Sequence, residues 1–337
     1  MEGAEGAIVP KAEQSTTTVT SDMAPDPRVL VAILTFGRAQ MLPRLLRSAL
    51  AQSSQLQPRA DIIVVDNDPR ATARETVAAE FGESVRYVLH GAKGIAEGRN
   101  RILDEAADYD CVVLIDDDEV PDEHWLRHLV DAYLTHGSAA VAGPQFRDYE
   151  TAPDPRVAAA RESFDRPVYD SGTRMPAAAT NNLLLDVAVI RRLGLRFDPR
   201  FSVTGGSDTM FTRQLVRAGQ EIVWCQEAVA TEWVPSGRLT MEWVWKRSMR
   251  SGMTWSRTGV ALQTNAFHRL ATRCSGLARG TARFAAGTLR AGIGHLRRDN
   301  ATIGAGLRTQ ARGVGMVAGS LGVQYYEYRN VQKPTAV

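Results

Sequence analysis

Four consecutive acids, Asp116-Asp117-Asp118-Glu119, directly follow an apolar run and could bind a cation. Carboxylates packed this closely repel one another, and their pKa values rise unless a positive charge neutralises them. Side chains alternate along a strand, so Asp116 and Asp118 would point to the same side. Mg²⁺ and Mn²⁺ prefer hard oxygen ligands, usually one or two carboxylates together with substrate phosphates. The D-x-D spacing therefore predicts a divalent-cation site, although acidic loops after strands are also common without such a role.

Two other apolar runs also end in polar residues. Asp66-Asn67-Asp68 follows one of them, and Thr35-Phe36-Gly37-Arg38 follows the other. An aspartate at such a position can accept a hydrogen bond from the ring N–H of uracil or guanine, and Arg38 can face a phosphate or a base. Asp-Asn-Asp-Pro is also a strong turn former, which leaves a purely structural role open. No G-x-G-x-x-G motif follows the first run, so a dinucleotide-binding fold is not supported.

Two glycine-containing segments could complete a site. The first begins at Gly94 and opens a helix whose free N–H groups could face a donor, while Arg99 and Asn100 could reach back to the strand ends. An ordinary solvated helix start is the alternative. The second, Gly205-Gly206-Ser207-Asp208, precedes an amphipathic run. Asp208 is either a helix N-cap or a general base on a loop that the glycines allow to bend.

These segments require elements that bring them together. Apolar, β-rich runs at 28–36, 60–68, 85–90 and 109–119 alternate with helical patterns. Uninterrupted apolar strands that alternate with helices predict a mostly parallel α/β sheet covered on both faces. Ligands of such sheets bind at the carboxyl ends of the strands, and the polar residues described above stand at three of those ends.

The second half of the chain is less regular. We expect a loop at 151–176, a last strand or hairpin at 221–234, and helices from residue 239 onward, with an aromatic cluster at 243–255. Apolar residues recur at roughly helical spacing between about 267 and 328. The many glycines of that stretch weaken the prediction of long, regular helices there.

Composition indicates a globular protein, with 44% hydrophobic and 23% charged residues. The cysteines, Cys111, Cys225 and Cys274, are widely spaced, which favours reduced thiols in a cytosolic protein over a zinc site or disulfides. Residues 1–24 lack the basic start and apolar stretch of a signal peptide, and their composition predicts a disordered leader. No run of about 18 apolar residues occurs, so we expect no membrane-spanning segment.

Charge is divided unevenly along the chain. From Arg238 to the end there are 16 Lys and Arg but three acids, a formal charge of +13, whereas the remainder carries 24 basic and 35 acidic residues, or −11. A basic C-terminal region on an acidic body predicts contact with something anionic. We expect peripheral contact with a phospholipid surface; packing on the acidic body or a dimer contact is the alternative. Nucleic acid is not expected, because the aromatic residues cluster instead of alternating with the basic residues.

Taken in order, seven segments resemble inverting family 2 glycosyltransferases of the GT-A fold, in particular the bacterial polysaccharide type that includes succinoglycan-synthesis enzymes. The segments are LVAILTFGR, IIVVDND, GIAEGRNRIL, VVLIDDDEVPDEHWL, NNLLL, FDPRFSVTGGSDTMFTRQL and TEWVPSGRLTMEWVWKRSMRSG. They extend over about 28–252, and their joint order is more specific than any one motif. The resemblance implies a GT-A catalytic domain at 25–238, between the leader at 1–24 and a helical, basic C-terminal region at 239–337.

The resemblance also implies roles for single residues. The nucleotide sugar would be bound by Thr35, Arg38, Asp66, Asp68, Gly94, Arg99, Asn100, Asp116 and Asp117. Asp118 would be the main ligand of Mg²⁺ or Mn²⁺, together with Asp116, and Asp208 would be the catalytic base. The acceptor or diphosphate side would include Asn181, Asn182, Gly206, Ser207, Arg247 and Arg250, the last two in an R-x-x-R-x-G element that ends at Gly252. The family usually has Glu where this chain has Ser207, which affects acceptor positioning.

The implied activity is transfer of a sugar from a nucleoside-diphosphate sugar to a hydroxyl acceptor. The metal would neutralise the leaving diphosphate, and Asp208 would remove the acceptor proton. The acceptor could be a lipid-linked oligosaccharide, a natural product or a carrier-bound intermediate, reached in the cytoplasm or at the inner face of the membrane. Two other classes stay open. A nucleotidyltransferase would favour a glycine- and Lys/Arg-rich phosphate loop where only Gly37-Arg38 occurs, and Ser207 is compatible with a non-catalytic sugar-nucleotide-binding module.

Overall fold

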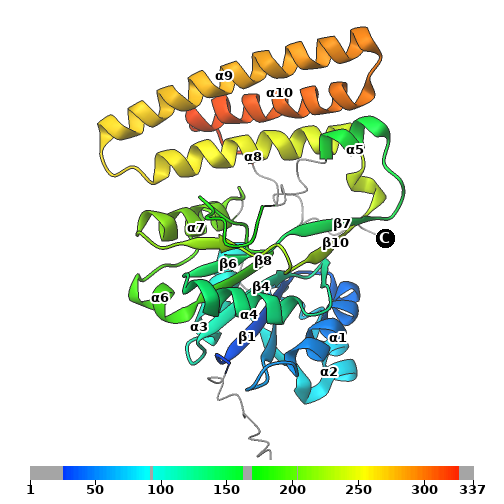
Figure 1. Cartoon of the computed structure of the whole chain (residues 1–337), viewed down its shortest axis with the longest axis vertical. Helices are drawn as coiled ribbons and strands as arrows, with labels where there is room; N and C mark the ends of the chain where they lie inside the picture. The colour runs from blue at the N-terminus through cyan, green and yellow to red at the C-terminus, as the bar shows by residue number, and fades with distance from the viewer. Residues whose placement is uncertain (1–25, 92–93, 162–168, 203, 326–337) are drawn as a thin grey trace, which may run out of the picture.

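The computed structural model describes residues 26–91, 94–161, 169–202 and 204–325, and a seven-stranded sheet forms its centre (Figure 1). The strand order is β3-β2-β1-β4-β8-β6-β9. Neighbouring strands are parallel except where β8 pairs with β4 and β6. The mostly parallel α/β sheet expected from the sequence is confirmed. The strands are β1 (Val29–Thr35), β2 (Asp61–Asp66), β3 (Arg86–Leu89), β4 (Cys111–Asp116), β6 (Ala140–Ala142), β8 (Asn182–Asp186) and β9 (Ile222–Trp224).

Helices cover both faces of this sheet. Alternate residues of its strands point to opposite sides, so each face has a core of its own. On one face, Val31 and Ile33 of β1 belong to a core with α1 (Leu42–Ser53), α2 (Arg74–Phe81) and α4 (Trp125–His136). On the other face, Leu30 and Ala32 belong to a core with α3 (Ile95–Glu105), α6 (Val187–Arg192) and α7 (Ser207–Arg217). Burial on both sides explains why these strands are apolar without alternation. Short 3-10 helices occur at η1 (Ala39–Met41), η2 (Gly82–Ser84), η3 (Pro199–Phe201) and η4 (Ser236–Arg238).

A second, three-stranded sheet has the order β5-β10-β7 and consists of β5 (Glu119–Pro121), β10 (Ala230–Val234) and β7 (Gln145–Tyr149). β10 is antiparallel to β5 and parallel to β7. The hairpin alternative for 221–234 is wrong, because β9 and β10 belong to different sheets. The pairing of Glu232 with Glu119 brings one further acid, Glu232, next to the acidic segment that follows β4.

Three helices follow the sheets: α8 (Met241–Ala261), α9 (Ala266–Arg297) and α10 (Asn300–Ser320). In Figure 1 they form a layer above β7 and β10, with α8 nearest the sheets and α9 at the outer edge. A short helix, α5 (Pro155–Arg161), packs against α8 and α10, with Val157 and Ala160 against Val244. The expectation of a continuous loop at 151–176 is therefore wrong at α5, and residues 162–168 lie outside the described chain.

The C-terminal helices are long despite their glycines, because several of those glycines lie where helices touch. A Cβ atom on Gly315 of α10 would overlap the Met249 carbonyl oxygen of α8, and one on Gly287 of α9 would lie 2.7 Å from the Gly306 carbonyl oxygen of α10. Glycine inside a helix costs about 1 kcal/mol relative to alanine, but here it allows two backbones to approach closely. The helices expected from residue 239 onward are confirmed, and the glycines do not prevent long, regular helices there.

Within the described residues, none of the helices combines the length and the apolar character that crossing a membrane requires. The leader expected at 1–24 lies outside those residues. The boundary predicted at 238/239 falls between η4 and α8, and it stays a prediction.

Candidate active site

The carboxyl ends of β1, β2 and β4 lie side by side at one edge of the central sheet. In the strand register, Thr35 is opposite Asp66, and Leu34 is opposite Asp116. The three polar strand ends singled out in the sequence therefore meet in space, because parallel strands all end at the same edge.

Thr35 and Arg38 contact the acidic turn that follows β4. Thr35 Oγ1 donates a hydrogen bond to Asp117 Oδ2 at 2.8 Å. Arg38 Nη1 lies 3.0 Å from Asp117 Oδ1 and 2.9 Å from Asp118 Oδ2. Arg238, at the end of η4, approaches Asp118 Oδ2 at 3.5 Å. These guanidinium groups offset part of the repulsion among the carboxylates and orient Asp117 and Asp118.

Asp116 is more open to a ligand than its two neighbours, with 43% of its side-chain surface exposed. The protein atoms around it still reduce its solvation, and this desolvation raises the pKa of its carboxyl group. Arg99 lowers the pKa, while the nearby carboxylates of Asp118 and Asp117 raise it. Burial likewise raises the pKa of Asp117, against the effect of Arg38. A bound cation would stabilise the ionised form of both groups.

The acids at this edge suit a divalent cation only together with phosphate oxygens. Within the part of the chain that the structure describes, no three Asp, Glu, His or Cys side chains are arranged to hold a metal ion by themselves. Mg²⁺ typically takes one or two carboxylates while substrate phosphates and water complete its coordination. Asp116 and Asp118 supply hard oxygen ligands of this kind, so their chemistry fits such an ion.

Arg99 connects the acidic turn to the start of α7. Its side chain is buried, with Nη2 3.7 Å from Asp116 Oδ1 and Nη1 3.4 Å from Ser207 Oγ. The guanidinium carbon also lies 5.7 Å from the centre of the Phe197 ring, which restrains the side chain from one side. Residues more than 90 positions apart in the sequence, Asp116 and Ser207, therefore share one arginine.

Asp208 occupies the first turn of α7. The N-cap is Gly206, with φ of 99°, so the interpretation of Asp208 as the cap residue is wrong. Oδ1 of Asp208 accepts a hydrogen bond from the Thr209 backbone N–H at 2.7 Å. Among the described residues, the hydrogen bonds to this carboxylate all go to Oδ1. A side chain on Gly206 would overlap Thr254 of α8, so glycine allows α8 to pack against the loop that carries Asp208.

Two of the predicted nucleotide ligands have mainly structural contacts. Asp66 is fully buried, and its carboxylate accepts from the backbone N–H groups of Asp68 and Ala73 and from the Tyr87 hydroxyl, each at 2.9 Å. Asp68 is held by Arg70, whose Nη2 lies 2.8 Å from Oδ2. Hydrogen bonds from Arg70 lower the pKa of Asp68. These contacts do not support direct binding of a base by either carboxylate, because both build the turn after β2.

Asn100 and Asn182 are likewise used within the protein. The Asn100 side chain makes two hydrogen bonds to the Phe197 backbone, at 2.9 and 2.8 Å, and so does not reach back to the strand ends. Asn182 is fully buried; it accepts from Trp125 Nε1 at 2.9 Å and donates to two backbone carbonyl groups. These contacts do not support the prediction that Asn182 forms an acceptor-side wall. Asn181 does lie near the acids, donating to Glu119 Oε1 at 2.7 Å.

The remaining predicted residues border the same edge or the helix that covers it. Gly94 precedes α3 with φ of 114°, and a Cβ atom there would lie 2.7 Å from Ser202 Cβ. On α8, Arg250 is buried and Arg247 is exposed. Gly252 packs against α10, because a Cβ atom there would overlap the Arg312 carbonyl oxygen. The glycine of the R-x-x-R-x-G element therefore serves helix packing.

Sequence reasoning missed several charged or polar residues of this edge. Glu232 of β10 pairs with Arg238 at 3.0 Å and with Arg147 at 3.4 Å, and it raises the pKa of Asp116. Glu232 is the one charged residue of β10, and this is the signal in the sequence that could have identified it. Asn67 is buried; its Nδ2 donates to the Gly94 carbonyl at 2.9 Å, and its Oδ1 has no partner among the described residues.

Comparisons with known proteins agree with this architecture. Residues 30–190 match the model of glycosyl transferase family 2. The chain is 32% identical over 230 residues to the succinoglycan biosynthesis protein ExoM of Rhizobium meliloti (strain 1021), an alignment that covers 67% of this chain and 74% of that protein.

Among solved structures, the mannosyltransferase PcManGT from Pyrobaculum calidifontis, in complex with GDP-Man and Mn²⁺, aligns with a TM-score of 0.55. The alignment has 18% identity and covers 88% of this chain and 89% of that one, so it supports the fold. GalNAc-T7 with UDP, GalNAc and Mn²⁺ aligns with a TM-score of 0.49 and 12% identity over 71% of this chain and 52% of that one. The sheet order, the polar strand ends and these similarities show that the chain is a GT-A glycosyltransferase and belongs to glycosyl transferase family 2.

Proposed function

We propose that this chain transfers a sugar from a nucleoside-diphosphate sugar to a hydroxyl acceptor, with inversion at the anomeric carbon and with the help of Mg²⁺ or Mn²⁺. The observation that carries the proposal is the position of Arg99, between Asp116 at 3.7 Å and Ser207 at 3.4 Å. Asp208 follows Ser207 directly. The buried side chain of Arg99 therefore links the acidic turn, which is suited to the donor, to the segment that carries Asp208, which is suited to the acceptor.

On the donor side, the acidic turn is the expected position of the diphosphate. A divalent cation bound by Asp118 and Asp116 would supply the positive charge that neutralises the leaving nucleoside diphosphate. Arg38 and Arg238, which pair with Asp118, are close enough to exchange part of that pairing for phosphate oxygens. Thr35 keeps Asp117 in place through its hydrogen bond. The Oδ1 atom of Asn67 has no partner among the described residues and lies near Gly94, so it is a candidate acceptor for a ring N–H of the base.

On the acceptor side, Asp208 removes the proton of the attacking hydroxyl group. The acceptor oxygen forms a bond to the anomeric carbon on one face as the bond from that carbon to the diphosphate oxygen breaks on the other, and the proton goes to Asp208. Oδ2 of Asp208 suits this role, because the hydrogen bonds described for its carboxylate go to Oδ1. No second carboxylate has to act as an acid, because the leaving diphosphate departs with its charge neutralised.

The neighbours support this choice of substrates. PcManGT was solved with GDP-Man and Mn²⁺, and the name of ExoM places that protein in succinoglycan biosynthesis. We therefore propose a sugar nucleotide as the donor and a hydroxyl group of a growing saccharide as the acceptor.

The variant Asp208→Asn tests the proposal. We expect turnover to fall by ~10²–10⁴-fold, the usual contribution of general-base catalysis, while the affinity for the donor stays unchanged. Donor binding is followed by thermal shift with UDP-, GDP- and dTDP-sugars and Mn²⁺, and turnover by release of nucleoside diphosphate. The control is Asp104→Asn on α3, an exposed aspartate paired with Arg196 at 2.6 Å. Loss of donor affinity in Asp208→Asn would contradict its role as base, and donor binding without any turnover in the parent protein would indicate a non-catalytic module.

A further inference from the structure

The outer helix α9 exposes a row of large apolar side chains. The exposed fractions are 76% for Phe267, 60% for Leu270, 67% for Leu289 and 88% for Leu296. Isolated exposed apolar residues are common on protein surfaces, but several of them on one uncharged helix face mark an interaction site. All four belong to one helix of 32 residues: Phe267 and Leu270 lie near its start, and Leu289 and Leu296 lie near its end, about 28 Å farther along the axis.

The pattern of α9 separates three faces. Gly280, Gly287, Ala291 and Gly294 are buried and contact α10. At 3.6 residues per turn, the exposed apolar residues lie on the opposite face, together with small residues such as Ala278, Ala285 and Gly292, and this outward face carries no charge. Four of the six arginines of α9 follow one flank of it: Arg279, Arg283, Arg290 and Arg297. The helix contains no acid.

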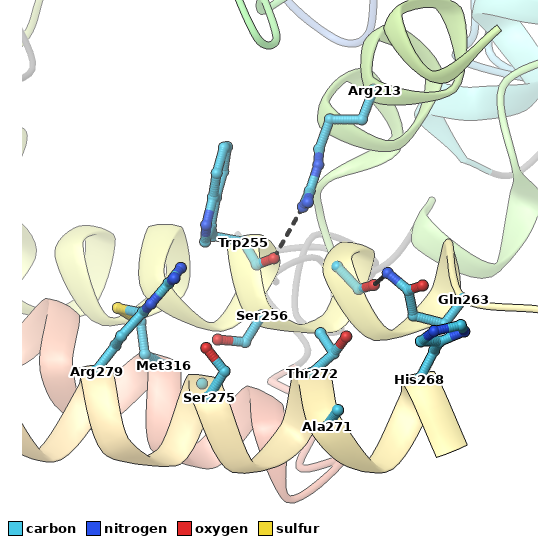
Figure 2. A pocket seen from close by; sticks show the side chains of 12 residues that line it. Arg213, Trp255, Ser256, Gln263, His268, Ala271, Thr272, Ser275, Arg279 and Met316 are labelled. Carbon is cyan, nitrogen blue, oxygen red and sulfur yellow. Dashed lines mark hydrogen bonds between the residues drawn. The ribbon is translucent and has the colours of Figure 1, made fainter. Parts of the chain in front are cut away.

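A groove runs along that arginine flank. Two adjoining cavities of about 360 and 570 Å³ share Trp255, Arg279 and Met316 in their linings. Figure 2 shows Arg213 reaching from α7 to α8, where it donates to the Trp255 carbonyl oxygen at 3.1 Å, while Arg279 extends from α9 on the same side. The groove therefore joins the outward face of α9 to α7, the helix that carries Asp208.

Positive charge is concentrated in this groove, and no ion pair to it occurs within the described part of the chain. Arg312 of α10 lines it beside Arg283, and Arg308 lies one turn before Arg312. Burial lowers the pKa of both α10 arginines, and repulsion from Arg283 lowers it further. Their Nε atoms are buried and have no hydrogen-bond partner among the described residues. From residue 266 to 320 the sole acid is Asp299, whose carboxylate caps the start of α10.

A polar atom also points into the groove from α8. Ser256 is only 6% exposed, lines the smaller cavity and has an Oγ without a hydrogen-bond partner among the described residues. Guanidinium groups whose Nε atoms lack a partner among the described residues, a buried hydroxyl and an indole ring are together suited to phosphate oxygens.

We propose that α9 lies in the interface of an anionic phospholipid membrane, with its outward face among the acyl chains and with the groove between α8, α9 and α10 binding lipid phosphates. Helices with an uncharged face and arginines on its flank bind membranes in this way. The acidic catalytic body does not cover α9, because α9 is the outermost helix (Figure 1). A second copy is a poorer partner, because two α9 helices would bring two sets of arginines and no acid into one interface.

Co-sedimentation of the full chain with vesicles tests this inference without any donor or acceptor, so its outcome is independent of catalysis. We compare vesicles of phosphatidylcholine with vesicles that also contain phosphatidylglycerol, at low and high NaCl. We expect binding to the anionic vesicles that weakens with salt. Removing arginines from the groove in Arg279→Ser/Arg283→Ser should weaken it by about fivefold for each residue, since a basic side chain at an anionic surface contributes ~1 kcal/mol.

The apolar face is tested by Leu289→Glu/Leu296→Glu, which should abolish vesicle binding. Both leucines are exposed, so the fold should be kept, which circular dichroism verifies. Matched controls on the catalytic body are Leu134→Glu, at a leucine 54% exposed on α4, and Arg44→Ser/Arg192→Ser, at two exposed arginines. Equal sedimentation of the parent and the α9 variants would overturn the proposal. Binding of inorganic phosphate or pyrophosphate in the groove without vesicle binding would overturn it too, as would a dimer that buries α9.

Discussion

Substituting two glycines of the C-terminal helices by alanine measures how tightly α8 is held over the candidate site. Gly315 of α10 lies against α8: an added Cβ atom would overlap the Met249 carbonyl oxygen and lie 2.6 Å from its carbon and 2.9 Å from the Met253 nitrogen. Gly292 of α9 has nothing within 4 Å of the corresponding position. Both glycines are inside helices, so the same substitution has the same intrinsic helix preference at the two sites.

The expected effects have opposite signs. Alanine is better than glycine inside a helix by about 1 kcal/mol, and Gly292→Ala should gain up to that amount. Overpacking of a close contact costs ~1–3 kcal/mol. The atoms that Gly315→Ala meets belong to the backbone, so no side-chain rotation relieves the overlap and the upper end of that range applies. After the helix gain is subtracted, Gly315→Ala should lose about 2 kcal/mol of unfolding free energy, about 3 kcal/mol below Gly292→Ala.

Urea unfolding followed by circular dichroism measures both variants. Because Thr254 of α8 contacts the loop at Gly206, displacement of α8 should also lower the turnover of Gly315→Ala while that of Gly292→Ala stays unchanged. Equal or higher stability of Gly315→Ala relative to Gly292→Ala would refute the reasoning, since it would mean that α8 and α10 are not in close contact at this point.

Three further predictions concern the carboxylates. Asp118→Asn should abolish turnover with the fold intact, and EDTA should do the same to the parent protein; full activity in excess EDTA would refute metal assistance. Arg99→Lys keeps the charge, but a lysine cannot span the two partners of Arg99. The loss of one charge-assisted hydrogen bond, ~1.5–3 kcal/mol, should lower turnover by about tenfold or more. Arg101→Lys on the same helix is the control and should not lower turnover. Hydrogen bonds from Arg70 lower the pKa of Asp68. These bonds therefore stabilise the folded protein at pH values above the ordinary aspartate pKa, and this stabilisation is lost as the pH falls through the lowered pKa of Asp68. Asp68→Asn should therefore reduce the loss of unfolding free energy below about pH 4 in urea titrations; an unchanged pH dependence would show that this pair contributes nothing.

Local patterns were sufficient to predict the central sheet and the position of the site. The buried strands at 28–36, 60–68 and 109–119 could be identified because both of their faces are covered, which requires continuous apolar residues. Once those strands are parallel, their carboxyl ends must share an edge, so the meeting of Thr35, Asp66 and Asp116 followed from the sequence alone.

Side-chain partners could not be predicted in the same way, because they depend on which distant elements come together. Asp66 and Asn182 look like ligand-binding residues in the sequence, but their polar atoms are satisfied by Tyr87 and Trp125. Asp208 looks like a helix cap until the structure identifies Gly206 as the cap.

In the C-terminal region, too, some properties follow from the sequence and others only from the tertiary structure. Its basic charge and its apolar spacing are properties of the sequence, whereas the direction that each face of α9 takes is not. Glycine lowers intrinsic helix stability, and this local cost argued against long helices. The tertiary structure decides otherwise, because residues such as Gly287 and Gly315 let helix backbones approach more closely than any side chain would allow. That packing buries the glycine face of α9 and leaves its apolar face outward.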